Sequence, residues 1–430
     1  MIDGKTASEI FDSIRQHVTT GALAPGETLP PVRELASELN VNRNTVAAAY
    51  KRLVTSGLAL SQGRNGTVIK GAPSPLALEG SSPDTPLTDL SGGNPDPQRL
   101  PDLSSYFSTI NKSPRLYGDA AVSPALHAWA KQWMQDAIPG EGEIDITSGA
   151  IDAIERLLCA HLLPGDSVAV EDPCFLSSIS MLRYAGFSAI PVGVDSEGMQ
   201  PEMLEQALKN GARAVILTPR AHNPTGCSLS ASRAAALQNI VAKYPQALVI
   251  IDDHFALLSS SPWHPVIAPE TLHWSVVRSM SKTLGPDLRL AIVASDPATS
   301  ARLRLRLNSG SQWVSHLLQD LVHACLSDKN YQRTLAQTRQ FYASQQQKLA
   351  CALQRTGLTH APGDGLNAWL PLKSHSQGIA FMLAKAGWLV REGEAFGVNA
   401  PAHGLRITLS TLGDGDINKL AADIHQALKR

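Results

Sequence analysis

Three short apolar runs in the middle of the chain each lead into a polar residue that can carry chemistry. They are AVILTP at 214–219, ALVIIDD at 247–253 and WSVVRS at 274–279. These runs alternate with Ala- and Leu-rich stretches, a pattern typical of βαβ units and a parallel sheet. We therefore expect an α/β fold in which the carboxyl ends of the strands meet at one edge, where ligands bind.

A proline-rich segment divides the 430 residues into two unequal parts. Residues 71–91 contain four prolines together with serine and glycine, and they show no sustained helical or strand period. Such a composition is typical of a semi-extended linker. We expect a small domain at 1–70 and a large domain at 92–430.

The charge of the protein is balanced overall but uneven along the chain. Lys and Arg number 37, Asp and Glu number 38, and the net charge is -1. Residues 1–70 carry eight basic and six acidic residues, and the stretch 43–70 has five basic residues and no acidic one. Any nucleic-acid contact is therefore expected in this N-terminal part.

The composition argues against several other classes of protein. No run approaches the roughly 18 apolar residues of a membrane span, and the N-terminus lacks a signal-peptide pattern, so we expect a cytoplasmic protein. Five cysteines without a CxxC pair argue against a disulfide framework. We expect no metal site, because Asp252, Asp253 and His254 are adjacent on a strand and cannot all point to one ion.

The first 70 residues predict three helices and a hairpin. Thr6 and Glu9 fit a capping box before a helix that Gly21 would end. A second helix follows Pro31, and a third begins at Asn42 or Arg43. The segments LALS and TVIK, separated by QGRNG, then predict a two-stranded wing.

Three helices and a wing make a winged helix-turn-helix, which places polar side chains and arginine in the major groove of DNA. Residues 21–69 resemble the DNA-binding domain of GntR-type regulators. A helical domain with a basic, solvated face is the alternative. The resemblance implies that the Gly66 wing lies along a groove. The expected contacts to bases and phosphates are Arg33, Arg43, Asn44, Thr45, Lys51, Arg52 and Arg64.

A candidate phosphate site lies at the start of a predicted helix in the large domain. Thr147, Ser148, Gly149 and Ala150 end a predicted strand and open this helix. Backbone N–H groups at a helix start suit a phosphate, although Ser-Gly before a helix can equally be an ordinary cap.

Two polar residues follow the first two apolar runs. Asn223 in AHNPTG places an amide at the expected ligand edge, although Asn-Pro also marks turns. Asp252 ends a buried strand, where a carboxylate needs a partner. A protonated pyridine nitrogen is one such partner, and an N-cap or a salt bridge is another.

Lys282 follows the third apolar run, in SMSKTLGPDLR. It can belong to a solvated loop, or it can bond a cofactor covalently while Ser279, Ser281 and Arg289 hold a phosphate. The amide, the carboxylate and the lysine follow three successive strands in this order. The combination indicates a pyridoxal 5'-phosphate (PLP) site.

Residues 91–430 resemble the fold-type I aminotransferases, which have a large α/β domain and a smaller C-terminal α/β subdomain. The resemblance implies that Lys282 forms a Schiff base with PLP, that Asp252 pairs with the pyridine nitrogen and that Asn223 bonds the ring hydroxyl. It also implies that Phe175 stacks on the ring and that the phosphate contacts include Arg289.

The resemblance gives roles to two residues away from these strand ends. Arg406 in LRITLS takes the position of the arginine that binds a substrate carboxylate. Tyr117 takes that of the tyrosine that reaches the phosphate of a neighbouring subunit. A surface arginine and a core aromatic residue are the alternatives.

A GntR-type reader fused to an aminotransferase-like domain is the architecture of the MocR family. His254 stands where the family has a tyrosine that donates to the ring oxygen of PLP. Val122 and His127 replace a glycine and an arginine of another family motif. An imidazole can still hydrogen-bond, so His254 is compatible with cofactor binding but predicts poor transamination.

Three functions stay open at this point. The MocR resemblance implies a homodimeric regulator that binds operator DNA and senses PLP, an amine or an amino acid, with vitamin B6 (pyridoxal kinase) metabolism as a candidate target. The second is a working aminotransferase with an appended DNA-binding domain. The third is a scaffold for dimerisation that holds no PLP and would be colourless.

Overall fold

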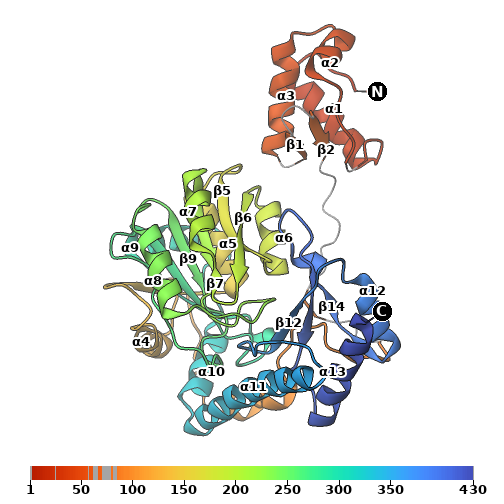
Figure 1. Ribbon diagram of the computed structural model, residues 1–430. Helices are drawn as coiled ribbons and strands as arrows, with labels where there is room; N and C mark the ends of the chain where they lie inside the picture. Colours follow the sequence, from red (N-terminus) through yellow and green to blue (C-terminus); the bar gives the residue numbers. More distant parts are fainter. Residues whose placement is uncertain are drawn as a thin grey trace. The chain divides into compact units, whose positions relative to one another are not determined.

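The computed structural model describes residues 2–24, 26–56, 58–61, 66–69, 79–80 and 85–429. The chain forms two compact units, one at the N-terminus and one that holds most of the chain, and each is described by itself (Figure 1). Among the described residues, no helix combines the length and the apolarity needed to cross a membrane.

The N-terminal unit is a winged helix-turn-helix, as predicted. Its elements are α1 (Ala7–Thr19), α2 (Val32–Leu39), α3 (Arg43–Thr55), β1 (Ala59–Ser61) and β2 (Thr67–Ile69). β1 and β2 pair in antiparallel fashion. Thr6 and Glu9 form the capping box, and the Asn42 side chain caps α3 by accepting from the Asn44 N–H.

A small apolar core holds the three helices together. Ile14, Leu35, Val46 and Leu53 are buried in it. The Tyr50 hydroxyl donates to the carbonyl oxygen of Pro30 at 2.7 Å, which ties α3 to the segment before α2. Because the inward positions of α3 are apolar, its polar residues lie on the outer face.

An eight-stranded sheet forms the centre of the large unit, with the order β4-β11-β10-β9-β8-β5-β6-β7. Its strands are β4 (Glu143–Thr147), β5 (Ser167–Asp172), β6 (Ser188–Asp195), β7 (Gly198–Met199), β8 (Ala212–Leu217), β9 (Leu248–Asp252), β10 (His273–Ser279) and β11 (Ala291–Ser295). Strands β10, β9, β8 and β5 are parallel. β11 is antiparallel to both of its neighbours, so the sheet is mixed rather than parallel throughout. The connection from β10 to β11 holds only a short 3-10 helix, η4 (Pro286–Leu288), whereas a parallel neighbour needs a longer crossover.

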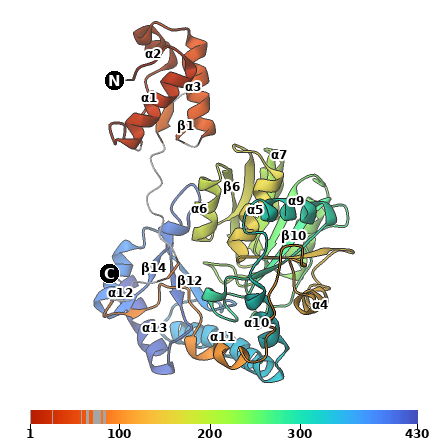
Figure 2. The same cartoon turned by 180° about the vertical axis from the view of Figure 1, so that it is seen from behind.

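Helices cover both faces of the sheet. α7 (Pro201–Lys209) and α8 (Ala231–Val241) contact each other on the face seen in Figure 1, and α5 (Ala150–His161) and α9 (Pro297–Asn308) contact each other on the face seen in Figure 2. This two-sided cover explains why the central strands are continuous apolar runs. The other helices of this part are α4 (Pro124–Trp133), α6 (Leu176–Tyr184), α10 (His316–Ser327), η2 (Pro97–Arg99) and η3 (Leu103–Tyr106).

A smaller C-terminal α/β subdomain follows, as predicted. Its elements are α11 (Lys329–Arg355), β12 (Asn367–Pro371), α12 (Gln377–Lys385), β13 (Trp388–Leu389), β14 (Arg391–Glu392), η5 (Gly393–Phe396), β15 (Gly404–Thr408) and α13 (Asp414–Leu428). β12, β15 and β14 form an antiparallel sheet in this order. Leu349, Leu405 and Leu420 belong to its core.

The end of the predicted linker packs into this large unit. β3 (Thr88–Asp89) pairs with β13, and Leu90 is fully buried in the same core. Residues 71–78 and 81–84 lie outside the described residues. The division at residues 70 and 91 stays a prediction, and the structure extends the packed region toward the N-terminus, into the segment predicted as linker.

Candidate functional site

The three predicted strand ends meet in one cavity. β10, β9 and β8 are neighbours in the sheet, so the residues that follow them lie at a common edge. A cavity of about 380 Å³ opens there. Its lining includes Ala150, Phe175, Asn223, Asp252, His254, Ser279, Ser281, Lys282 and Arg289.

Lys282 is a buried amine in this cavity. Its Nζ donates to the carbonyl oxygen of Gly93 at 2.5 Å. Burial lowers the pKa of Lys282 to about 8, an effect that Glu79 opposes and Arg406 strengthens. A substantial fraction of the amine is therefore unprotonated slightly above neutral pH, which is the nucleophilic form.

Asp252 and Asp253 have opposite surroundings. Asp252 lines the cavity, and its Oδ1 has no hydrogen-bond partner within the described part of the chain. Burial, with a smaller effect of Asp253, raises the pKa of Asp252 to about 7. Asp253 instead accepts from Arg220 at 3.0 and 2.6 Å and from Arg278 at 2.9 Å. The unpartnered oxygen of Asp252 is thus available to a donor bound in the cavity, such as a protonated ring nitrogen.

Asn223 belongs to a polar group at the wall of the cavity. Its Oδ1 accepts from Arg406 Nη1 at 3.1 Å, and its Nδ2 donates to Glu79 Oε1 at 3.1 Å. The structure therefore brings the predicted Arg406 next to the predicted cavity. Arg406 itself does not line the cavity, but Asn223 and Glu79, to which it is bonded, do.

The start of α5 forms one end of the cavity. Gly149 precedes the helix with φ 99° and offers no side chain to cap it, so within the described residues no capping side chain competes with a ligand for the N–H groups of the first turn. Arg289 Nη2 donates to the carbonyl oxygen of Ser148 at 3.3 Å. A Cβ on Gly149 would lie 2.6 Å from Arg289 Nη2, so glycine permits this approach. The helix end and the guanidinium group together suit a phosphate.

Two serines and two ring side chains complete the predicted set. The Ser279 hydroxyl donates to Ser281 Oγ at 3.2 Å, and both serines line the cavity. Phe175 lines the cavity just before α6. Burial, with a smaller effect of the positive charge of Lys282, lowers the pKa of His254 to about 4, so its imidazole is neutral near pH 7.

Tyr117 lies away from this cavity. It is 86% exposed and packs edge-on against Trp313, with ring centroids 5.7 Å apart. It lines a different hollow, together with Trp313 and Arg115. Its predicted contact is with the phosphate of a second subunit, so that role stays a prediction.

Seven of the lining residues were not predicted as site residues, among them three with polar or charged side chains beside the strand ends or in the linker. Glu79 fell in the predicted linker, and Ser177 and Thr218 also line the cavity. Thr218 stands in the run AVILTP and directly follows β8, so its place at a strand end was a usable signal. Glu79 had no such signal, because nothing local distinguishes it from a solvated acid.

The predicted DNA contacts lie on one small unit. Arg33 on α2 and Arg43, Asn44, Lys51 and Arg52 on α3 are exposed. Thr45 is half-buried, and the Arg52 guanidinium lies 4.6 Å from the centroid of the Phe11 ring. In the wing Gly66 has φ 87°, which favours glycine, and Arg64 lies outside the described residues.

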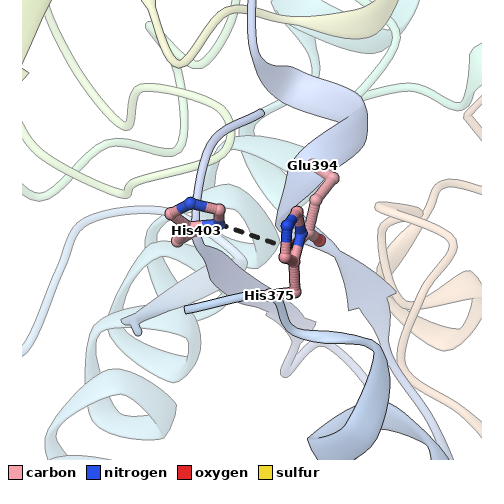
Figure 3. A group of neighbouring side chains, drawn as sticks. All are labelled: His375, Glu394 and His403. Carbon is pink, nitrogen blue, oxygen red and sulfur yellow. Dashed lines mark ion pairs between the residues drawn. The ribbon is translucent and has the colours of Figure 1, made fainter. Parts of the chain in front are cut away.

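A separate group of possible metal ligands lies in the C-terminal subdomain. Figure 3 shows His375, Glu394 and His403, whose ligand atoms lie within 4.8 Å of one another. Glu394 Oε1 is 3.5 Å from His375 Nδ1 and 3.6 Å from His403 Nδ1, and it also accepts from the Ser376 N–H at 2.7 Å. Two imidazoles and a carboxylate suit a divalent transition metal. The expected absence of a metal site therefore stays a prediction.

Comparison with known proteins assigns families to both parts of the chain. Residues 6–69 match the bacterial regulatory proteins of the gntR family, and residues 87–424 match the aminotransferases of class I and II. The chain belongs to the MocR family. As a MocR-type regulator, it joins a GntR helix-turn-helix domain to an aminotransferase-like domain.

Similar proteins agree with this MocR assignment. The vitamin B6 salvage pathway transcriptional repressor PtsJ of Salmonella typhimurium is 79% identical over 430 residues, which is the full length of both chains. The uncharacterized HTH-type transcriptional regulator YdeF of Bacillus subtilis is 26% identical, over 92% of this chain and 88% of the relative.

Solved structures confirm the fold of the aminotransferase-like part of this MocR protein. Kynurenine aminotransferase from Pyrococcus horikoshii has a TM-score of 0.70 and 22% identity, over 81% of this chain and 93% of the other. The α-aminoadipate aminotransferase LysN from Thermus thermophilus has a TM-score of 0.70 and 23% identity, over 80% and 92%.

Proposed function

We propose that this MocR-type regulator binds PLP in the cavity at the ends of β8, β9 and β10 and represses vitamin B6 salvage genes in response to it. The observation that carries the proposal is the buried, unpartnered Oδ1 of Asp252 in the same cavity as the Lys282 amine. A buried acceptor without a donor is costly, and the protonated pyridine nitrogen of PLP would supply the donor.

The other predicted cofactor residues at this cavity would have roles toward the same group. The first turn of α5, Ser279, Ser281 and Arg289 would hold the phosphate, and Phe175 would stack on the ring. Bound PLP supplies an electrophilic aldehyde and a ring that withdraws electrons. Lys282 would supply an unprotonated amine toward that aldehyde, Asp252 would keep a proton at the ring nitrogen, and Asn223 would hydrogen-bond the ring hydroxyl.

The name of a relative supports the biological part of the proposal. The 79% identical protein is a vitamin B6 salvage pathway transcriptional repressor. We infer the same class of target here, such as a pyridoxal kinase gene, with residues 1–70 as the DNA reader and residues 92–430 as the PLP sensor. A homodimer would place two readers on a repeated operator, and Tyr117 of each subunit at the phosphate of the other.

The test combines cofactor trapping with DNA binding, both on the full chain. Borohydride reduction of the PLP-loaded protein should fix the cofactor to Lys282, which peptide mass spectrometry locates, and Lys282→Ala should fix none. An adduct on another lysine would contradict the assignment. If PLP changes operator affinity by some factor, operator DNA must change PLP affinity by the same factor. Equal PLP affinity with and without operator would overturn PLP sensing.

A working aminotransferase is the second candidate. It is favoured by Asn223 and a lysine of lowered pKa that line one cavity, with Arg406 bonded to Asn223 behind the lining. The neutral imidazole of His254 occupies the place where the family has a tyrosine hydroxyl. The visible absorbance of the PLP-loaded protein after addition of an amino acid would distinguish the two functions, since only a working aminotransferase converts bound PLP to its amine form.

A further inference from the structure

The carboxylate of Glu79 is bound in two-point fashion by Arg406. Oε1 of Glu79 lies 2.5 Å from Nη1 of Arg406, and Oε2 lies 2.8 Å from Nη2. Asn223 Nδ2 adds a third hydrogen bond to Oε1 at 3.1 Å. Two parallel N–H···O bonds are the geometry by which arginine recognises a carboxylate.

Arg406 has no remaining pair of donors for a second carboxylate. The residue is fully buried on β15, with both terminal nitrogens bonded to Glu79. Nη1 also donates to Asn223, and Nη2 donates to the carbonyl oxygen of Ser91 at 2.5 Å. A ligand carboxylate could reach the same two nitrogens only by displacing Glu79.

The backbone around Glu79 is held in place by the large unit. The Gly80 N–H donates to the carbonyl oxygen of Gly92 at 3.0 Å, and Arg391 Nη2 donates to that of Gly80 at 3.0 Å. Gly93 has φ 63°, and a Cβ there would lie 2.6 Å from Glu79 Oε2. A glycine at 93 thus leaves the space that the carboxylate fills.

The charges in the cavity keep this carboxylate ionised. Burial alone would raise the pKa of Glu79, but Arg406, and after it Lys282 and Asn223, hold the pKa below its usual value. Glu79 therefore presents the same anionic group that an amino acid would bring.

We propose that Glu79 is an internal carboxylate that fills the carboxylate subsite of this cavity, so that the full chain accepts aldehydes and amines without a carboxylate and disfavours amino acids. The proposal rests on the proposed function, in which the cavity holds PLP. It makes Glu79 a specificity-determining residue and assigns the effector to the vitamin B6 compounds or simple amines.

The first experiment compares two ligands that differ only in the carboxylate. L-Leucine and isoamylamine share the amine and the side chain, and each is titrated into PLP-loaded full-length protein while the visible spectrum is recorded. Glu79→Ala should raise the affinity for L-leucine at least tenfold and change the affinity for isoamylamine by no more than about twofold. The exposed Glu270→Ala is the matched control and should change neither. Unchanged L-leucine affinity in Glu79→Ala would overturn the proposal.

The second experiment needs no PLP and keeps the two proposals distinguishable. 4-Methylpentanoate has the side chain and the carboxylate but no amine. Calorimetric titration should detect its binding to Glu79→Ala apo protein and not to wild type, and its addition should raise the melting temperature of the variant. The smaller, polar Glu79→Ser, which also empties the subsite, serves if the alanine variant folds poorly. Adding Arg406→Gln to either should abolish binding. If the protein never takes up PLP but 4-methylpentanoate binds the variant and not the wild type, PLP sensing is refuted and the internal carboxylate is retained. If 4-methylpentanoate binds the wild type, the internal carboxylate is refuted.

Discussion

Asp252 and Asp253 are adjacent at the end of β9, yet one is shared between two arginines and the other has an oxygen with no partner among the described residues. Asp253 is fully buried and holds Arg220 and Arg278, while Asp252 lines the cavity. The alternation of side chains along an extended strand separates a structural carboxylate from a functional one. We therefore expect the change of Asp to Asn to destabilise the apo protein at position 253 and to stabilise it at position 252.

Asp253→Asn should strongly destabilise the protein. It would leave two guanidinium groups, each at most 8% exposed, without their shared carboxylate. Breaking a buried ion pair on one side costs about 3–5 kcal/mol. Denaturant unfolding of the apo protein measures this loss, and a loss below about 1 kcal/mol would contradict the buried triad.

Asp252→Asn should stabilise the apo protein at pH 8 and abolish the gain in stability from PLP. The pKa of Asp252 is raised to about 7 from 3.8, so the native state binds more protons than the unfolded state between these values. The free energy of unfolding therefore falls as the pH rises toward 7, and the loss due to Asp252 is at most about 4 kcal/mol. Melting curves at pH 5 and pH 8, with and without PLP, test both the higher stability of the apo variant and its lack of stabilisation by PLP. Equal stability of wild type and variant at pH 8 would contradict the raised pKa.

The rate of PLP uptake should depend on pH through Lys282. Only the unprotonated amine attacks an aldehyde, and burial lowers the pKa of Lys282 to about 8. Stopped-flow absorbance of apo protein mixed with PLP should show a rate that rises from pH 6 to 9 with a midpoint near 8. A midpoint near 10.5, the value of an ordinary lysine, would mean that the amine is solvated.

Substitutions on α3 should separate base contacts from phosphate contacts. Arg43→Ala, at the first residue of the helix, should weaken binding about tenfold or more and relax sequence choice. Lys51→Ala should weaken binding to all sequences alike and reduce the salt slope by about one. Titration of specific and scrambled duplexes at several salt concentrations tests this, with the exposed Arg333→Ala as control. If Arg43→Ala and Lys51→Ala change the relative affinities for different DNA sequences in a similar way, the assignment of Arg43 to bases and Lys51 to phosphates is wrong.

The site residues at strand ends could be predicted because their positions follow from local patterns. Continuous apolar runs identify buried strands, and the parallel order of β8, β9 and β10 brings their ends together. Asn223, Asp252 and Lys282 therefore needed no knowledge of distant packing. The same local reasoning recovered the capping box at Thr6 and the wing.

The remaining features depend on contacts between distant parts of the chain. Glu79 and Arg406 are separated by 327 residues, and nothing near Glu79 in the sequence marks a buried pair. The antiparallel β11 was also missed, because a buried antiparallel strand has the same apolar composition as its parallel neighbours. Strand direction is decided by the length of the connection, here the short segment after β10.

The position of Glu79 affects how fragments of this protein behave. The region that matches the aminotransferases begins at residue 87, so a fragment trimmed to that boundary would lack a side chain of its own pocket. Its arginine would be open, and a screen for effectors with such a fragment would select amino acids and other carboxylates. The intact chain would reject the same compounds. Trimming a few residues can therefore reverse the apparent ligand preference without altering any residue of the matched region.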